Sequence, residues 1–346
     1  MLPTQDMNAL LIDMPAEIPD HLPLLVWTGA AGRASDELLG RIQQGLEQRG
    51  VRLRSACCRK TERTRKSADT RAQAGCFLPI QARELLRALT GYELLFFEQS
   101  ENSASFSLEG PLRWPAVLRL GEVPKAEDRP AAAEQFVCLA DNDIDRCVDA
   151  IITWLQSCRR RTVLAACLLI GGRSSRMGRP KHLIEDEQGI TWLEHTIAAV
   201  RPLVSELVLS GAGDLPERLS HLPRVQDLPG IGGPLAGIGA AMRSQPFVSW
   251  IVLACDMPDI TPVALNWLLG QRHDGSLAII PHNPLSGRSE PLCAWYDYRC
   301  GVLIEGLLAS GEQKISALCG KKGVTEPLIP DELSPCWRNV NRPDEL

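Results

Sequence analysis

Short apolar runs alternate along the chain with stretches whose apolar residues recur at helical spacing. The runs are bounded by glycine, proline or polar residues, as is typical of strands, and the stretches between them are typical of amphipathic helices. Strands are predicted at 23–29, 51–57, 93–98, 116–120, 135–140, 163–170, 206–210, 250–256, 277–281 and 291–296. Because strands that alternate with helices are typical of parallel sheets, the pattern predicts an α/β fold.

Capping residues locate several of the helices between these strands. Thr191 and Glu194 have the spacing of a capping box, and Pro262 after Thr261 suits a first helical turn. Helices are predicted over 36–49, 81–89, 143–159, from 191 to about 203, after Thr261-Pro262, and over 299–309.

The elements form two groups, each with the order of an α/β domain. Residues 1–22 contain several prolines and are expected to be a leader without regular structure. Residues 23–159 begin with a strand, a glycine-containing loop and a helix, which predicts a degenerate P-loop-like domain. Residues 163–346 are predicted to form a Rossmann-like, doubly wound and mostly parallel sheet, with ligands at the carboxyl ends of its strands.

The composition narrows the class of protein. At 346 residues, 45% hydrophobic and 23% charged, the chain is typical of soluble globular proteins with two domains. A net charge of −5 gives no general attraction for nucleic acid or an anionic membrane, so neither is expected as a partner. No apolar run reaches the ~18 residues of a membrane span, and the acidic start is unlike a signal peptide. A cytoplasmic location is therefore expected.

The cysteines and histidines do not have the spacing of a metal site. Twelve cysteines show no C-x-x-C pair, and Cys138, Cys167 and Cys255 lie inside apolar runs, so reduced and buried thiols are expected. Among the six histidines, His182 is the one expected near a functional site, and it is expected to be neutral.

The strand at 163–170 ends in a loop rich in glycine and cations. Gly171 and Gly172 are followed by Arg173, Arg176, Arg179 and Lys181. Glycines allow backbone N–H groups to approach an anion, and the cations neutralise its charge, so the loop predicts phosphate binding.

Two acids follow apolar segments of the same half of the chain. Asp256 ends the strand at 250–256 and Asp227 precedes a glycine-rich stretch. Because a hard divalent cation that bridges phosphates needs a carboxylate, Asp256 is the strongest candidate for a Mg²⁺ ligand.

These segments together resemble the MobA-like nucleotidyltransferases. Leu168–Lys181 reads LLIGGRSSRMGRPK and resembles the family's signature loop. Later segments are similar to further family motifs in the same order, namely 227–238, 255–258, 290–296 and 339–346. Enzymes of this family make the guanine dinucleotide form of the molybdenum cofactor from GTP and molybdopterin. The resemblance thus implies an Mg²⁺-dependent guanylyltransferase that releases pyrophosphate.

The resemblance also assigns roles to individual residues. It implies catalytic roles for Arg176, Lys181 and Asp256, with Asp256 as the metal ligand. The implied nucleotide-binding residues are Leu169, Gly171, Gly172, Lys181, Ser210, Asp227 and Asp256. The implied residues on the acceptor side are Arg288, Glu290, Asn339 and Asn341.

The chain departs from the family pattern at two places. Ile170 stands where the family usually has alanine, and this bulkier side chain is expected to crowd the pocket. Ser210-Gly211 stands where many relatives have asparagine, which bears on selectivity for guanine.

Residues 22–158 loosely resemble MobB, the GTP-binding partner of MobA. The loop at 29–37 lacks the lysine and hydroxyl pair of a working P-loop, and Asp36 and Glu37 would repel a triphosphate. A degenerate MobB-like scaffold or adaptor is therefore expected here, in preference to an active GTPase.

Two other functions remain open from the sequence. The first is a related transferase that uses CTP or another acceptor. The second is a catalytically silent protein that carries cofactor or docks on a molybdoenzyme, and apo-molybdoenzymes are candidate partners in either case.

Overall fold

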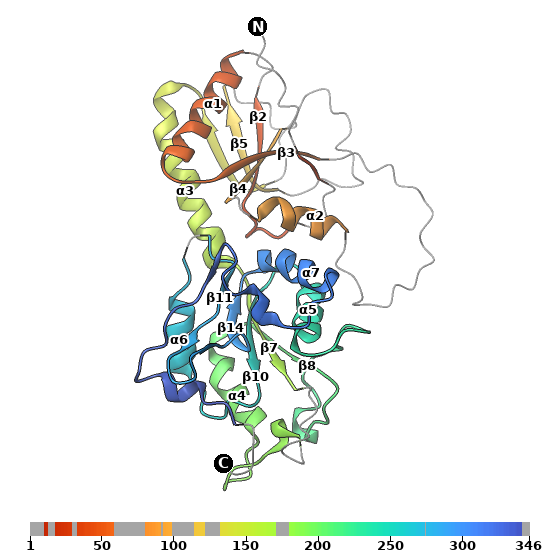
Figure 1. Ribbon diagram of the computed structural model, residues 1–346. Coiled ribbons are helices and arrows are strands. Elements are labelled where there is room, and N and C mark those ends of the chain that lie inside the picture. Colours follow the sequence, from red (N-terminus) through yellow and green to blue (C-terminus); the bar gives the residue numbers. More distant parts are fainter. Residues whose placement is uncertain are drawn as a thin grey trace, which may run out of the picture. The chain divides into compact units, whose positions relative to one another are not determined.

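The computed structural model describes residues 10–12, 18–29, 33–58, 80–90, 93–98, 114–121, 132–170, 180–273 and 275–340. These residues divide into two compact units (Figure 1). The described residues up to Thr162 form unit 1, and those from Val163 onwards form unit 2.

Unit 1 is built on a six-stranded sheet in which every described pair of strands is parallel. Its strands in the order β1-β3-β4-β2-β5-β6 are Leu10–Ile12, Leu53–Cys58, Leu94–Glu98, Leu24–Gly29, Trp114–Leu120 and Ala132–Cys138. Its helices are α1 (Arg33–Gln48), α2 (Ile80–Leu89) and α3 (Ile144–Arg161).

Apolar periodicity explains how α1 and α3 cover one face of this sheet. Ile42 and Leu46 of α1 and Val148 and Ile151 of α3 are fully buried in one cluster with alternate residues of the strands. Each such side chain contributes about 1.5–3 kcal/mol when it leaves water.

Unit 2 is built on a seven-stranded, mostly parallel sheet in the order β15-β11-β14-β10-β7-β8-β9. These strands are Val324–Thr325, Ala278–Ile279, Cys293–Tyr296, Ser249–Ala254, Leu164–Leu169, Glu206–Ser210 and Arg224–Val225. Strand β14 alone among them runs antiparallel to its neighbours β10 and β11. A separate two-stranded ribbon consists of β12 (His282–Asn283) and β13 (Arg288–Ser289).

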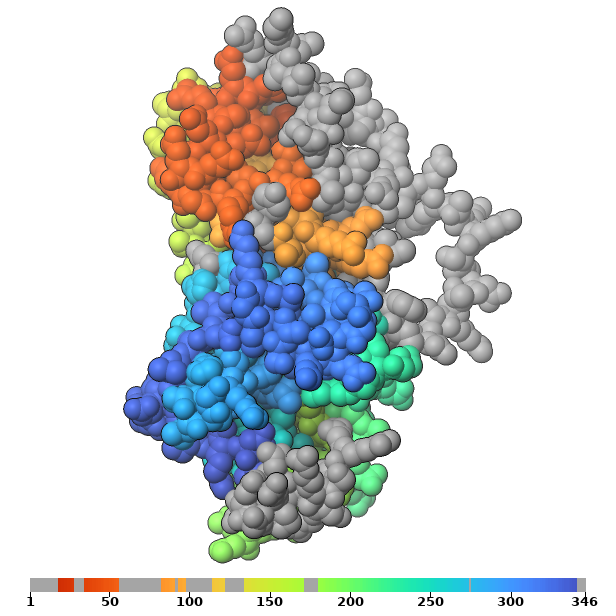
Figure 2. Space-filling view, in the orientation of Figure 1, coloured from red at the N-terminus to blue at the C-terminus, as the bar shows by residue number. Residues whose placement is uncertain are grey.

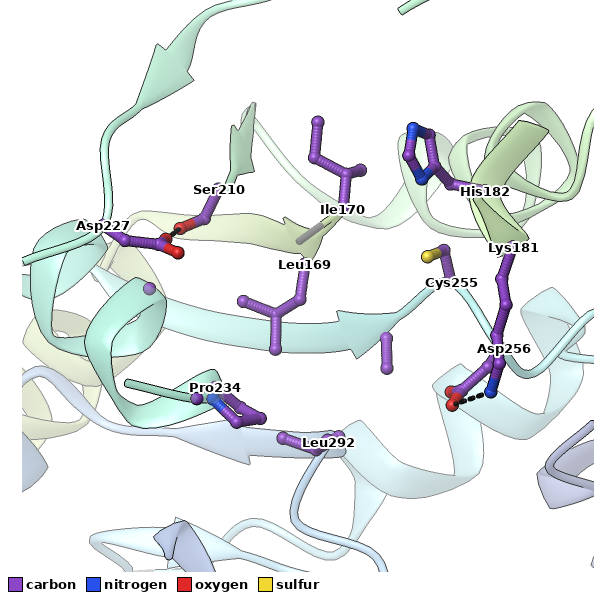
Figure 3. Close-up of a pocket in the computed structure, with 13 residues that line it drawn as sticks. Leu169, Ile170, Lys181, His182, Ser210, Asp227, Pro234, Cys255, Asp256 and Leu292 are labelled. Atoms are coloured by element: carbon purple, nitrogen blue, oxygen red, sulfur yellow. Dashed lines mark hydrogen bonds and ion pairs between the residues drawn. The ribbon is translucent and has the colours of Figure 1, made fainter. Parts of the chain in front are cut away.

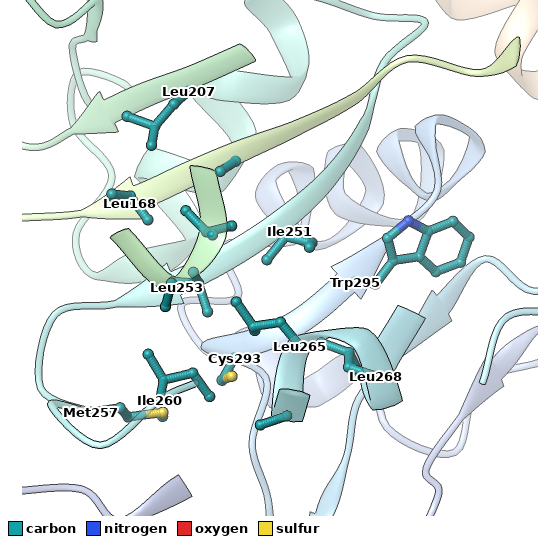
Figure 4. Close-up of a cluster of buried hydrophobic side chains, with 14 of the residues drawn as sticks. Leu168, Leu207, Ile251, Leu253, Met257, Ile260, Leu265, Leu268, Cys293 and Trp295 are labelled. Atoms are coloured by element: carbon teal, nitrogen blue, oxygen red, sulfur yellow. The ribbon is translucent and has the colours of Figure 1, made fainter. Parts of the chain in front are cut away.

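Helices cover both faces of this sheet, as predicted for a doubly wound fold. The helices are α4 (Trp192–Val200), α5 (Pro234–Ser244), α6 (Pro262–Gly270) and α7 (Gly301–Ala309). Leu168 of β7 packs with residues of α4 and α6, whereas the next residue, Leu169, packs with residues of α5 and α7. Figure 4 shows the first cluster, in which Leu253 of β10 and Leu265 of α6 also lie.

The predicted caps of two helices are confirmed. The Thr191 hydroxyl accepts from Glu194 N at 3.3 Å, and the Glu194 carboxylate accepts from Thr191 N at 2.9 Å, which completes a capping box at the start of α4. The Thr261 hydroxyl accepts from Ala264 N at 3.2 Å, with Pro262 in the first turn of α6.

One expectation about local structure is wrong. Leu10–Ile12, within the supposed leader, forms β1 and pairs in parallel with β3, because this apolar triplet lies between the prolines and can extend the sheet. The glycine-rich stretch after Asp227 leads into α5, which begins at Pro234 and continues to Ser244.

The expectation of buried, reduced thiols is confirmed for three cysteines. Cys138, Cys167 and Cys255 are buried free thiols. No helix within the described ranges has both the length and the apolar character needed to cross a membrane. In the space-filling view, α7 and the segment after it, in blue, form a continuous part of the surface of unit 2 (Figure 2).

Candidate functional site

A pocket of about 310 Å³ lies in unit 2 at the carboxyl ends of β7, β8 and β10, beside the start of α5 (Figure 3). This is the edge of a parallel sheet at which α/β proteins bind ligands. Its lining residues are Leu169, Ile170, Lys181, His182, Ser210, Asp227, Gly233, Pro234, Gly237, Ala254, Cys255, Asp256 and Leu292. Segments far apart in sequence therefore meet at one cavity.

One end of the pocket carries an ion pair. Lys181 Nζ, from the short 3₁₀ helix Lys181–Leu183, lies 3.1 Å from Asp256 Oδ2, just beyond the end of β10. The two side chains are only 15% and 20% exposed, so water screens their attraction less than it would at the surface. The pair joins the segment after β7 to the segment after β10.

The second oxygen of Asp256 tests whether a metal would fit here. Asp256 Oδ1 is buried and, within the described part of the chain, accepts no hydrogen bond. Buried polar atoms almost always have a hydrogen-bond or metal partner. Carboxylate oxygens are ligands that hard divalent cations prefer, so such a cation is a suitable partner for this oxygen. No cluster of three or more His, Cys, Asp and Glu side chains that could enclose a metal occurs among the described residues, so such a cation would depend on other ligands as well.

The opposite end of the pocket carries a hydrogen bond between a hydroxyl and a carboxyl group. The buried Ser210 hydroxyl, at the end of β8, donates to Asp227 Oδ1 at 2.9 Å (Figure 3). The bond fixes one oxygen of this otherwise exposed carboxyl group.

Gly237 of α5 makes this arrangement possible. A Cβ atom at Gly237 would lie 2.5 Å from Ser210 Oγ, 3.1 Å from Leu169 Cδ2 and 3.2 Å from Asp227 Oδ1. The first distance is shorter than packed side chains allow, so α5 approaches β8 this closely only because residue 237 has no side chain.

His182, which was predicted to be neutral, closes another part of the wall. Its side chain is buried, and Nε2 donates to the Asp214 carbonyl at 2.7 Å, since a carbonyl oxygen only accepts. Burial lowers the pKa of the imidazole. A Cβ atom at Gly213 would meet His182 Cε1 at 2.5 Å, so this loop also needs a glycine.

Cys255 lines the pocket but is unsuited to act as a nucleophile. Burial, with a further contribution from the Asp256 charge, raises the pKa of its thiol to about 12. The reactive thiolate is therefore scarce at neutral pH.

The structure brings some predicted site residues together and separates others. Leu169, Lys181, Ser210, Asp227 and Asp256 all line the pocket. Gly171, Gly172, Arg176 and Asn341 lie outside the described residues.

The predicted acceptor-side residues lie beyond the lining of the pocket. Arg288 is exposed on β13, and Glu290 is half-buried shortly before β14. Asn339 is exposed, although the next residue, Val340, donates its backbone N–H to the Asp256 carbonyl at 2.9 Å. The end of the described chain thus lies against the Asp256 segment.

Ile170, the residue whose bulk was expected to crowd the pocket, also lines it. Its side chain is 3% exposed and belongs to the cluster that includes Leu168 and Leu193, on the face of the sheet opposite Leu169. Most of its bulk is therefore taken up by the core.

Pro234 lies in the 227–238 motif and lines the pocket, whereas sequence reasoning missed Leu292 as a pocket residue. Leu292 could not have been recognised, because its place beside Ala254 depends on the antiparallel pairing of β14 with β10.

Comparisons with known proteins agree with this location. The family described as "MobA-like NTP transferase domain" matches residues 166–324, which contain the whole lining of the pocket. A protein named "Probable molybdenum cofactor guanylyltransferase" from Bacillus cereus (strain AH820) is 32% identical over 165 residues, which cover 46% of this chain and 81% of the relative. A protein of the same name from Bacillus thuringiensis (strain Al Hakam) has the same identity and coverage.

Among solved structures, molybdopterin-guanine dinucleotide biosynthesis protein A from Archaeoglobus fulgidus is 27% identical, with a TM-score of 0.44. The match covers 52% of this chain and 94% of that one.

Proposed function

The chain belongs to the MobA-like NTP transferases, and from this premise we propose that it transfers GMP from GTP to molybdopterin and releases pyrophosphate. Membership makes it a nucleotidyltransferase; the proposal concerns the nucleotide and the acceptor. The relatives from Bacillus are named for guanylyl transfer, and the chain covers 81% of their length.

One observation carries the proposal, namely the Lys181–Asp256 pair at the carboxyl edge of the sheet, in which the buried Asp256 Oδ1 accepts no hydrogen bond from the described residues. Nucleotidyl transfer brings several phosphate charges together, and the protein must neutralise them and hold the reacting groups in line. Lys181 supplies a cation, and Asp256 supplies an oxygen for a divalent metal, which we propose is Mg²⁺.

The proposed reaction forms one bond and breaks one. A terminal phosphate oxygen of molybdopterin bonds to the α-phosphorus of GTP, and the bond from that phosphorus to the bridging oxygen of the β-phosphate breaks. The electron pair leaves with pyrophosphate, whose developing charge Lys181 would stabilise. Bound Mg²⁺ would draw charge from the phosphate oxygens.

The other end of the pocket supports guanine as the base. The Ser210 hydroxyl uses one lone pair of Asp227 Oδ1, so Oδ2 and the second lone pair of Oδ1 can still accept from a base. Guanine presents two adjacent N–H donors on one edge, whereas cytosine and adenine present one donor beside an acceptor. A carboxylate is thus better matched to guanine, even though Ser210 replaces the asparagine of many relatives.

Pyrophosphate release by the purified chain, with molybdopterin and each of GTP, CTP, ATP and UTP in turn, tests the proposal. We expect turnover with GTP that depends on molybdopterin. Turnover with CTP alone would assign the cytidylyl reaction instead, and no turnover with any nucleotide would favour a silent carrier of cofactor.

We further propose that unit 1 is a scaffold related to MobB that does not bind nucleotide. Its strand β2 leads towards α1 as in a P-loop protein, but Asp36 in the first turn of α1 and the adjacent Glu37 are exposed, and their charges would repel a triphosphate. Equilibrium dialysis of the full chain against a non-hydrolysable GTP analogue should give one bound nucleotide per chain. Two would contradict this assignment.

A further inference from the structure

A second acid, Glu290, shortly precedes strand β14, the neighbour of β10, whose end leads to Asp256. Strands β10 and β14 pair antiparallel from Trp250 with Tyr296 to Leu253 with Cys293. The pairing continues one step further, where Ala254 N donates to the Leu292 carbonyl at 2.8 Å. Asp256 lies two residues after this last bond, and Glu290 lies two residues before it on the facing chain.

The surroundings of Glu290 hold it near that edge. Its N–H donates to the Pro281 carbonyl at 2.8 Å, and its own carbonyl accepts from Cys293 N at 3.1 Å, so the backbone is fixed on both sides. The Ser286 hydroxyl donates to Glu290 Oε1 at 3.3 Å. Burial raises the pKa of the Glu290 carboxyl, and the negative charge of Asp256 raises it further, so the two groups interact electrostatically.

One acceptor oxygen at this edge has no hydrogen-bond partner among the described residues. Lys181 faces Asp256 Oδ2, and the exposed Arg288 attracts Glu290 from its own ribbon, but Asp256 Oδ1 is buried and accepts no hydrogen bond from the described residues. The proposed reaction would add two converging phosphate groups here. A second carboxylate beside them would oppose binding unless a cation of higher charge lay between.

We propose that Glu290 is a second carboxylate ligand, with Asp256, of the divalent cation that serves nucleotidyl transfer. This inference rests on the proposed function, and it moves Glu290 from the acceptor side to the metal. Two carboxylates on facing chains can share one cation, and the remaining positions can be filled by water and phosphate oxygens, as Mg²⁺ prefers. The cation would then satisfy Asp256 Oδ1 and remove the repulsion between the two acids.

Binding of Mn²⁺, followed by electron paramagnetic resonance of the free ion, tests the inference without any transfer reaction. The full chain is titrated in the presence of an α,β-methylene analogue of GTP, which cannot transfer GMP. We expect Glu290→Gln to weaken Mn²⁺ binding about 10- to 100-fold, and Glu290→Asp to retain more affinity than Glu290→Gln because it keeps the charge.

Glu206→Gln is the matched control. Glu206 is exposed at the start of β8, the end of that strand opposite the pocket, so the same chemical change there should leave Mn²⁺ affinity unaltered. Because Glu290→Gln replaces a group whose pKa is raised by burial with a neutral one of equal shape, the thermal midpoint should not fall, and circular dichroism checks this.

Unchanged Mn²⁺ affinity in folded Glu290→Gln would overturn the inference. The same holds if the variant only raises the KM for molybdopterin, since Glu290 would then contact the acceptor. Either result leaves guanylyl transfer by the wild-type chain intact. If the wild-type chain bound neither the analogue nor Mn²⁺, the proposed function itself would fail.

Discussion

Each end of the pocket contains one aspartate, but the two differ in burial and in the groups that contact them. Asp256 is mostly buried, faces the ammonium group of Lys181 at 3.1 Å, and has one oxygen that accepts no hydrogen bond from the described residues. Asp227 is exposed and is oriented by a neutral hydroxyl at 2.9 Å. The first arrangement is suited to gathering charge, and the second to presenting one acceptor atom in a fixed direction.

The difference indicates a division of labour along the cavity. Electrostatic stabilisation is strongest where water is excluded, so changes at the Asp256 end should act on kcat. A hydrogen bond close to water has a modest net free energy, so changes at the Asp227 end should act on nucleotide KM and on the choice of base.

Asp256→Asn should have the largest effect. The substitution keeps the shape but removes the negative charge that would hold a divalent cation, so we expect kcat to fall about 10²- to 10³-fold. Steady-state pyrophosphate release measures it, with Asp227→Asn as the matched change at the other end. Equal losses of kcat in the two variants would contradict the division of labour.

Lys181→Met should have the next largest effect. Methionine keeps much of the apolar stem but removes the cation, so kcat should fall about 10²-fold, and Asp256 should be left without its partner. Lys314→Met, at an exposed lysine outside the pocket lining, is the control. A Lys181→Met enzyme with normal kcat would show that the ammonium group is not needed for transfer.

Gly237→Ala should weaken nucleotide binding at the Asp227 end of the pocket, because the added methyl group disturbs the packing there. The added methyl would overlap Ser210 Oγ, so either the serine rotates or α5 shifts, at about 1–3 kcal/mol of stability. We expect a raised KM for GTP and a lower midpoint of chemical unfolding. Gly306→Ala in α7, where a Cβ would meet nothing within 4 Å, should be harmless. A harmless Gly237→Ala would refute the close approach of α5 to β8.

Ser210→Ala should have a smaller effect confined to recognition. Loss of one hydrogen bond of about 1 kcal/mol corresponds to roughly a fivefold rise in KM for GTP, with kcat unchanged. The preference for GTP over CTP should narrow as well, and Ser210→Thr, which keeps the hydroxyl, should restore part of it. A fall in kcat without a change in KM would show that Ser210 acts on the transfer step and not on nucleotide recognition.

The smallest effect should come from His182→Gln, which should change how the stability of the folded chain depends on pH. The pKa of His182 is lowered in the folded chain by burial, so the unfolded chain binds the proton more readily. The stability due to the neutral imidazole is therefore present above the unfolded pKa of about 6.5 and lost as the pH falls below it. Thermal midpoints at pH 7.5 and pH 5.5 should differ less in His182→Gln than in the wild type, and an equal difference would exclude this histidine as a source.

The sequence predicted the parts of the fold that depend on local pattern. Continuous apolar runs marked β7 and β10, and the Thr191 capping box marked α4. The bounds of helix α5 were not predicted: Leu235, Ile238 and Met242 recur at helical spacing, but Gly237 and Gly239 between them disfavour a helix. A short strand such as β1 has too few residues to show any period at all.

The candidate site was predictable only in part, for a related reason. The residues of the pocket that end predicted strands, such as Ser210 and Asp256, could be named because parallel strands end at the same edge. The approach of the segment before β14, which contains Glu290, to the end of β10 depends on the antiparallel direction of β14 and on its register with β10, and neither leaves a pattern in the sequence.

Label transfer from GTP tests most directly whether the pocket in unit 2 performs guanylyl transfer. The full chain is incubated with molybdopterin and GTP that carries ³²P at either the α- or the γ-position, and the labelled products are separated. The account predicts that the α-label appears in the molybdopterin product and the γ-label in pyrophosphate, and that Asp256→Asn slows both together. Transfer of the γ-label to molybdopterin, or label transfer that Asp256→Asn leaves unchanged, would contradict it.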